Sequence, residues 1–462
     1  MPSGRRDFDV LVAGAGTSGS ACALFLARNG FRVALVENRS LEKAGARWVN
    51  GVPDWMIESA GIALPVPPES RGRARAFILA DFEGNNRLRI APSPVRQIYV
   101  PLLVKRLHDL CRDHDVKLFG HFFAGKLRLM AGRPIELEGR VRQTSRAARS
   151  INLRARLFVD ASGLAGALRR QVPLLAKSCP PPPPNHLCSA AQQVCRVADT
   201  NGAQVFLEQN RLEPGEVLAR LGVAGGFSTA SIYLAEDLSE VELLTGSIGD
   251  GRHPDGPHMM AELKRKQRWI GNIIYGGAGL IPLRRPYDRL VAPGFALVGD
   301  SACQVFPAHG SGTGSGLLAA RALADAVGGQ KDPGALDALW HYQAAWQRGF
   351  GATCASYDVF RRFSQALNGP RISQLLSSGL VTTAFWRAGL EQVLPRISFQ
   401  DMSTAFKGLA KNPSLAILLP CLAAMGATRS LYGVYPRSFD PRLLAGWERV
   451  ASWLFRRTPE KT

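Results

Sequence analysis

The chain has 462 residues, of which 46% are hydrophobic and 20% charged, so it is long enough for two or three packed units and too apolar to be disordered or collagen-like. It carries 57 lysines and arginines against 37 aspartates and glutamates, a formal net charge of +20, but no helix-turn-helix, RNP-type or paired Cys/His finger signature, so we expect no nucleic-acid partner. Its eight cysteines have neither the density of a disulfide framework nor the short spacing of a metal site, and we expect reduced thiols and no bound metal.

The N-terminal region predicts one βαβ unit. Residues 8–13 form an apolar run of strand length, residues 17–29 carry a helical pattern, and residues 32–36 form a second strand that ends at Glu37. A right-handed crossover between the two strands places both of them in a parallel sheet. No apolar segment with a cleavage site precedes the first strand, so we expect a cytoplasmic protein.

A glycine-rich turn joins the first strand to the helix. Gly14 permits the tight turn, Gly16 lets a pyrophosphate approach the backbone, and Gly19 permits close packing of the helix on the strand. The helix N-terminus offers unpaired N–H groups to phosphates, and an acid at the end of the next strand can accept hydrogen bonds from a ribose. The predicted cofactor contacts of this unit are Gly14, Gly16, Thr17, Ser18, Gly19, Glu37 and Asn38.

The middle of the chain is less regular. Glycine, proline and arginine are interleaved over residues 40–94, residues 95–114 predict a helix, and residues 153–160 predict another strand. The proline run at 180–184 can neither continue a helix nor pair as a central strand, so we expect a stiff connector. Glycine-punctuated apolar stretches over residues 190–248 predict a β-sheet.

The C-terminal half begins with a further strand, at residues 294–300, and a second glycine-rich turn, which leads to a helix at 317–327. From residue 335 onward the pattern is helical. Residues 415–427 form the most apolar stretch, but a proline and a glycine interrupt it. We expect a buried helix hairpin there, with an interfacial membrane contact as the alternative.

These motifs, in this order, resemble the flavoprotein superfamily that includes aromatic hydroxylases, flavin-dependent halogenases and geranylgeranyl reductases. Residues 291–302, with Pro307 and the glycines after it, resemble its second FAD signature, and residues 160–163 resemble its third motif in the reductase and halogenase form. The resemblance covers residues 7–328 and implies bound FAD, with Asp300 on the ribityl chain. The further contacts that it implies are Arg47, Arg96, Ala161, Gly163, Gly299, Asp300, Pro307, Gly312, Thr313 and Gly314.

Two catalytic candidates follow from the turns. Small residues over 307–316 leave backbone amides bare before a helix, and such a nest suits the negative edge of a reduced flavin. His309 is the titratable group in that turn, and it either donates to the flavin or substrate or makes a structural hydrogen bond. Arg47, with Trp48, lies where the family brings a loop to the flavin, or else on a surface loop.

The predicted fold is therefore α/β, a Rossmann-like FAD-binding domain with an inserted β-sheet substrate domain and a helical C-terminal region. The first part of the FAD domain spans 1–180, with an irregular insertion at about 40–94, and its second part spans 285–330. The substrate domain spans 185–284, and the helical domain spans 331–462.

The reaction predicted is an FAD-dependent oxidation or reduction of an apolar small molecule or carrier-bound substrate. Our first hypothesis is a monooxygenase-type oxidation in a dry pocket. The alternative is reduction of carbon–carbon double bonds, as in geranylgeranyl reductases, although Ser228 and Thr229 stand where those enzymes carry an aromatic pattern ending in proline. Tryptophan-halogenase motifs are absent from the sequence.

Two questions about partners stay open at this point. No second glycine fingerprint marks a nicotinamide domain, so NAD(P)H visits transiently or a partner reductase supplies the electrons. As an alternative from another class, the chain is a flavin-containing membrane- or lipid-binding protein, with a peripheral membrane contact through its basic C-terminal helices.

Overall fold

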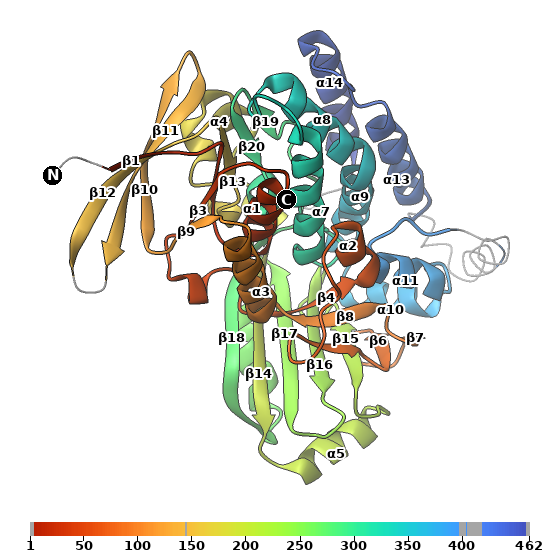
Figure 1. The fold of residues 1–462 in the computed structure, drawn as a ribbon. Coiled ribbons are helices and arrows are strands. Elements are labelled where there is room, and N and C mark those ends of the chain that lie inside the picture. Colours follow the sequence, from red (N-terminus) through yellow and green to blue (C-terminus); the bar gives the residue numbers. More distant parts are fainter. Residues whose placement is uncertain (1–3, 144–145, 397–402, 404–417, 459–462) are drawn as a thin grey trace.

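A six-stranded sheet lies at the centre of the region that is predicted to bind FAD (Figure 1). The structure is a computed structural model and describes residues 4–143, 146–396, 403 and 418–458. Five strands run parallel and the edge strand β19 is antiparallel. The strands are short runs of valine, leucine, alanine and phenylalanine because both faces of a parallel sheet are covered. In spatial order they are β19 (Val291–Ala292), β20 (Phe295–Leu297), β13 (Leu157–Asp160), β2 (Val10–Ala13), β3 (Val33–Val36) and β9 (Lys117–Phe119).

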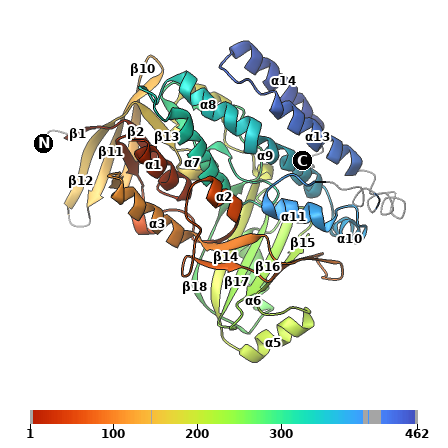
Figure 2. The ribbon, with the colours of Figure 1, turned by 45° about the vertical axis from the view of Figure 1, so that its right-hand side comes forward.

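A layer of helices packs on this sheet. Helix α1 (Thr17–Arg28) lies between α3 (Val100–Asp113) and α7 (Thr313–Val327) (Figure 2). Glycine makes the close contact possible, since a Cβ atom on Gly316 of α7 would lie 2.0 Å from the Ser18 Oγ of α1. The predicted βαβ unit and α/β fold class are confirmed. All eight cysteines are buried, and none is bonded to another.

A four-stranded sheet contributes side chains to the same hydrophobic core as the parallel sheet. It consists of β1 (Gly4–Asp7), β12 (Arg146–Arg154), β11 (Arg133–Gln143) and β10 (Phe122–Met130). Buried side chains from its strands, among them Phe122, Leu137 and Leu153, belong to this core. None of these four strands was predicted, because frequent arginines obscure their alternation of apolar and polar residues.

The second large layer is a seven-stranded sheet, which confirms the β-sheet expected after residue 190. Its neighbours are antiparallel except β15 and β6. Helices α5 (Thr200–Gln209) and α6 (Gly256–Arg265) cover one face, where Phe206, Met260 and Trp269 are buried. In spatial order the strands are β18 (Ile270–Pro282), β14 (Leu187–Val197), β17 (Glu240–Ile248), β16 (Ser228–Leu234), β15 (Glu216–Leu221), β6 (Ala76–Ala80) and β7 (Arg87–Ile90).

Two sequence predictions for the first hundred residues were wrong. Residues 40–94 are not irregular, because they contain β6 and β7 of the large sheet and two strands of a small sheet. The predicted helix at 95–114 begins only at Val100, since Pro101 has no N–H and fits the first turn of a helix but not its interior. The small sheet has the order β4 (Val49–Pro53), β8 (Val95–Tyr99) and β5 (Ser70–Arg73), with α2 (Asp54–Ser59) following β4.

Beyond residue 335 the described chain is helical, as predicted. The apolar stretch predicted at 415–427 falls partly outside the described residues, and from Leu418 it is not a fully buried hairpin. One face of α13 is buried and the other is exposed. The helices are α8 (Leu336–Trp346), a π-helical turn (Gln347–Gly351), α9 (Ala352–Gln365), α10 (Gly369–Ser377), α11 (Thr383–Glu391), α13 (Leu418–Gly433) and α14 (Pro441–Arg457). Among the described residues, no helix combines the length and hydropathy needed to cross a membrane.

Candidate functional site

A cavity of about 1010 Å³ extends from the carboxyl ends of the parallel strands to one face of the seven-stranded sheet. This face is the one opposite α5 and α6. Crevices at this edge of a parallel sheet are where cofactors bind in open α/β folds. Most of the predicted cofactor-binding and catalytic residues lie on the cavity wall. They are Gly14, Gly16, Thr17, Ser18, Glu37, Asn38, Ala161, Gly163, Asp300, His309, Gly312 and Thr313.

The turn before α1 has the geometry predicted for a phosphate-binding turn. Gly14 has φ +103°, and a Cβ atom there would lie 2.3 Å from the carbonyl oxygen of Ala161. A Cβ atom on Gly19 would lie 1.8 Å from the carbonyl oxygen of Gly14, so this glycine serves helix–strand packing and does not line the cavity. The bare start of α1 therefore faces the cavity with its unpaired N–H groups.

Glu37 closes the turn from the side. Its Oε2 accepts a hydrogen bond of 3.0 Å from the amide of Ala15, and its Oε1 accepts one of 3.1 Å from the amide of Arg39. These two bonds hold a buried carboxylate at the cavity wall, at the end of β3 where the spacing predicted it. A carboxylate acceptor on this side of the cavity suits the hydroxyl groups of a dinucleotide's ribose.

The second glycine-rich turn reaches the same cavity from the opposite side. Gly312 and Thr313 begin α7, and Asp300 lies in the 3₁₀ turn that follows β20. The Asp300 carboxylate has no hydrogen-bond partner among the described residues, and its removal from water raises the pKa of Asp300 to about 6. An acceptor held without a donor is the kind of group that a polyhydroxyl chain would satisfy.

This carboxylate predicts a pH dependence of FAD affinity. Hydroxyl donors favour ionised Asp300, so FAD binding must displace a proton at pH values below the pKa of about 6. The affinity of the wild-type chain for FAD should therefore fall as pH is lowered from about 8 to about 5. Fluorescence titration should show a weaker and flatter dependence for Asp300→Asn. Asp113→Asn, an exposed change at the end of α3, should match the wild type, and equal pH profiles for all three would contradict the assignment.

His309 lies on the cavity wall, and its ring packs on Phe306 with centroids 4.9 Å apart. The His309 side chain is exposed to the cavity, and the protein packed around its ring lowers the pKa of the imidazole. Its Nε2 lies 3.2 Å from the carbonyl oxygen of Gly389, which requires the proton on that nitrogen. The ring thus links the second glycine-rich turn (residues 307–316, which we call the flavin turn) to α11, which is the structural hydrogen bond considered as the alternative role for this residue.

Six predicted site residues do not line the cavity. Arg47 is exposed, although its neighbour Trp48 is on the wall. Arg96 lies on strand β8 and not on a helix, and its Nε and Nη2 donate to Asp54 at 2.8 and 2.9 Å. The other four lie in the surrounding turns and helices. At Gly314, for example, close packing requires glycine, since a Cβ atom there would lie 2.6 Å from the sulfur of Met56. The six are Gly19, Arg47, Arg96, Gly299, Pro307 and Gly314.

Sequence reasoning missed Gln192, which fixes the loop on which Trp48 lies. Gln192 is buried in β14, and its side-chain amide both accepts from the Val49 amide and donates to the Val49 carbonyl oxygen at 2.8 Å. From the other side, the Ser311 Oγ donates to the Asn50 Oδ1 at 2.8 Å. The loop is therefore tied both to the large sheet and to the flavin turn. A glutamine inside an apolar strand was the available signal.

Loss of the Gln192 clamp should loosen this loop. Gln192→Leu leaves both backbone groups of Val49 without their side-chain partner, which should lower the free energy of unfolding by about 1–3 kcal/mol. It should also change the visible spectrum of bound flavin, because Trp48 and Asn50 share its cavity. The matched control is Gln193→Leu, on the next residue of the strand. Equal denaturation curves and spectra for the two variants would contradict the clamp.

Away from the glycine turns, the cavity becomes an apolar chamber between the large sheet and helices α9 to α11. Within the described lining, the charged side chains are Glu37, Arg39 and Asp300, all near the turns. The apolar side chains that enclose the chamber are Phe77, Leu79, Leu221, Phe227, Leu244, Ile281, Phe360, Leu367, Ile372, Leu375, Leu376, Phe385, Trp386 and Leu390. Such a chamber favours a hydrocarbon over a charged ligand.

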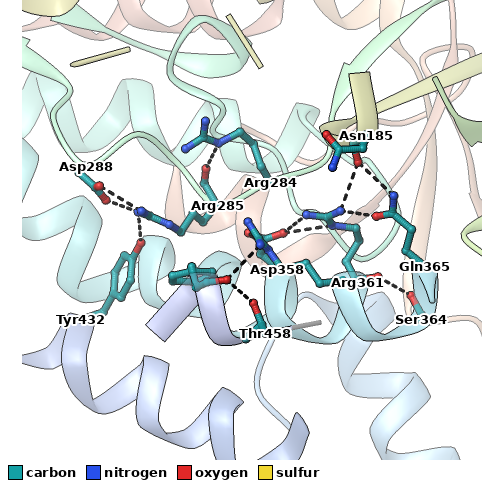
Figure 3. A network of polar contacts seen from close by, with 12 residues as sticks. Asn185, Arg284, Arg285, Asp288, Asp358, Arg361, Ser364, Gln365, Tyr432 and Thr458 are labelled. Atoms are coloured by element: carbon teal, nitrogen blue, oxygen red, sulfur yellow. Dashed lines mark hydrogen bonds and ion pairs between the residues drawn. The ribbon is translucent and has the colours of Figure 1, made fainter. Parts of the chain in front are cut away.

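A buried polar network lies along and beside the wall helix α9 (Figure 3). Asp358 is fully buried and pairs with Arg361, whose Nε lies 3.1 Å from Oδ1, and with Arg362, whose Nε lies 3.4 Å from Oδ2. The two guanidinium groups hold the pKa of Asp358 well below its usual range, against the effect of burial. A second pair, Arg285 with Asp288, is joined to the hydroxyl group of Tyr432 on α13.

Comparisons with known proteins agree with this geometry. Residues 9–171 match the family model described as FAD dependent oxidoreductase, and the glycine cradles and the unpartnered Asp300 fit that cofactor. The family match and the relatives together support placing the chain among the FAD-dependent oxidoreductases, with FAD as its cofactor.

The relatives that are similar in sequence are named as reductases, whereas the proteins that are similar in structure have more varied names. This flavoprotein is 23% identical over 451 residues to the digeranylgeranylglycerophospholipid reductase of Sulfolobus acidocaldarius, covering 96% of each chain. A geranylgeranyl bacteriochlorophyll reductase-like protein of Thermoplasma acidophilum shares its fold with a TM-score of 0.72 and 18% identity, over 91% of this chain and 100% of that one. A flavin-dependent brominase has a TM-score of 0.56 and 14% identity, over 98% and 100% of the two chains.

Proposed function

We propose that this flavoprotein reduces carbon–carbon double bonds in the isoprenoid chain of a lipid. The observation that carries the proposal is the continuity of the cavity, in which an apolar chamber without charged side chains opens onto the flavin turn. The reductase names of the relatives support reduction over the monooxygenase reaction that the sequence analysis placed first.

The proposal assigns the ends of FAD to the two turns. The start of α1 would bind the pyrophosphate, Glu37 a ribose, and Asp300 the ribityl chain. The amides at Gly312 and Thr313 would face the pyrimidine edge of the flavin. Bound and reduced, FAD supplies a hydride to one carbon of the double bond, and a proton adds to the other.

The chain's own residues position the substrate and keep water away. Aromatic and aliphatic side chains of α9, α10 and α11, such as Phe360, Ile372 and Trp386, would hold an extended hydrocarbon against the sheet. Thr229 and Ser231 add hydroxyl groups to the chamber wall, through which a proton from solvent can reach the substrate. The two electrons come from NAD(P)H or a partner reductase.

Product analysis tests this function. The holoprotein, reduced under nitrogen with dithionite, is incubated with a polyprenyl lipid, and the lipid is examined by mass spectrometry. We expect a gain of two hydrogens for each double bond reduced, with the same product in nitrogen and in air. A product that contains oxygen and forms only in air would overturn the proposal in favour of oxygenation.

A further inference from the structure

The exposed side of α13 and α14, which we call the C-terminal face, has both apolar and basic side chains. Figures 1 and 2 show the two helices side by side on the outside of the helical region. Five large apolar side chains on this face are 40–62% exposed to solvent. They are Leu419 and Leu422 of α13 and Leu443, Val450 and Trp453 of α14.

On α14 these residues are arranged as in a helix that lies in a membrane interface. Leu443, Val450 and Trp453 are spaced by seven and three positions and share one stripe, which flanks the buried side of the helix that carries Trp447 and Phe455. The adjacent stripe is basic and consists of Arg442, Arg449 and Arg456, all exposed. Such a helix inserts its apolar stripe at the headgroup boundary while the arginines remain among the headgroups.

The positive charge of the C-terminal face favours a negatively charged partner. Residues 418–457 contain six arginines and two acidic residues. Asp440 caps the start of α14, accepting from the amides of Arg442 and Leu443, and Glu448 is partly buried. A second copy of this chain would bring like charges together, whereas an anionic lipid surface would be attracted. The Arg457 guanidinium lies 4.3 Å from the Trp453 ring centre, so a cation and an aromatic ring meet at the level where membranes favour them.

We infer that the C-terminal face docks this flavoprotein on an anionic bilayer. Helix α13 packs against α9, and α9 contributes Tyr357 and Phe360 to the cavity wall. Docking would therefore bring a bilayer within one layer of helices of the apolar chamber. The proposed function gives the docking its purpose, but the docking itself involves no substrate and is measured without turnover.

Vesicle flotation of the full-length holoprotein tests the inference. With phosphatidylcholine vesicles that contain phosphatidylglycerol, we expect the protein to float at low salt and to lose most of its binding at high salt. Pure phosphatidylcholine vesicles should float much less. Val450→Glu with Trp453→Glu should lower the bound fraction by about tenfold or more. The triple change Arg442→Gln, Arg449→Gln and Arg456→Gln should remove the preference for phosphatidylglycerol.

Matched controls lie on the far sheet region. Val205→Glu changes an exposed valine on α5, and the triple control changes three exposed arginines, Arg211→Gln, Arg252→Gln and Arg268→Gln. These variants should float like the wild type, and the flavin spectrum of every variant should show that it is folded. Three outcomes would overturn the inference: no flotation at low salt, equal flotation of the α14 variants, or a dimer that these variants dissociate. Flotation without lipid reduction would leave the docking standing and refute only the proposed function.

Discussion

Gly14→Ala should yield a chain that purifies without FAD. Gly14 has φ +103°, which disfavours any other residue, and the added Cβ atom would lie 2.3 Å from the Ala161 carbonyl oxygen and 2.8 Å from the Ser162 Cα. Both neighbours are backbone atoms, so the turn itself must move. Since the cofactor depends on close approach to this turn, FAD affinity should fall by about a hundredfold or more, which corresponds to about 3 kcal/mol.

Gly30→Ala separates this steric effect from backbone strain alone. Gly30 also has a positive φ, +84°, but a Cβ atom there meets nothing within 4 Å. This control should lower stability by about 1–2 kcal/mol and leave FAD affinity unchanged. Equilibrium dialysis of both purified variants against FAD gives the comparison. Wild-type affinity in Gly14→Ala would show that the cofactor does not lie against this turn.

Asp358→Ala should strongly destabilise helix α9, which forms part of the cavity wall. It removes the carboxylate that pairs with the guanidinium groups of Arg361 (Figure 3) and Arg362 inside the protein. Breaking one partner of a buried ion pair costs about 3–5 kcal/mol, a large part of the total stability of a typical domain. Urea unfolding followed by circular dichroism measures the loss. Asp358→Asn, which keeps the shape but not the charge, should lose most of the same amount.

The pH dependence of this contribution has a defined sign. Because the folded pKa of Asp358 is lowered, its stabilisation is fully present above the ordinary aspartate value and disappears as pH falls through the lowered pKa. The wild type and Asp358→Asn should therefore differ most near neutral pH and converge in strong acid. Asp325→Asn removes an exposed ion pair with Arg321 and should cost less than about 1 kcal/mol. Equal costs for the two positions would contradict the network.

Local patterns made the cofactor side of the molecule predictable. Gly14, Gly19 and Glu37 fall within one βαβ unit, where short sequence distances fix the geometry. The same local reasoning failed at Val95–Tyr99, because tertiary pairing with β4 and β5 makes this segment a strand, and Pro101 then sets the start of α3. Arg96 was misplaced for the same reason.

The substrate side depends on contacts between distant segments. Gln192 meets Val49 across 143 positions, and His309 meets Gly389 across 80. No local pattern encodes such pairs, so the residues that line the apolar chamber could not be predicted from the sequence, although the helices of its C-terminal wall were. Ser228 illustrates the limit. Its hydroxyl group donates to the Gly225 carbonyl oxygen and accepts from the Ala224 amide, which shapes a turn, so its presence does not argue against an apolar substrate.

Rapid mixing of the dithionite-reduced holoprotein with a polyprenyl lipid under nitrogen tests most directly whether FAD and a hydrocarbon share this cavity. The account predicts that the visible absorbance of oxidised flavin returns at a rate that rises with lipid concentration, with one double bond lost for each flavin oxidised. A flavin that stays reduced in the presence of the lipid, and is oxidised only when air is admitted, would contradict it.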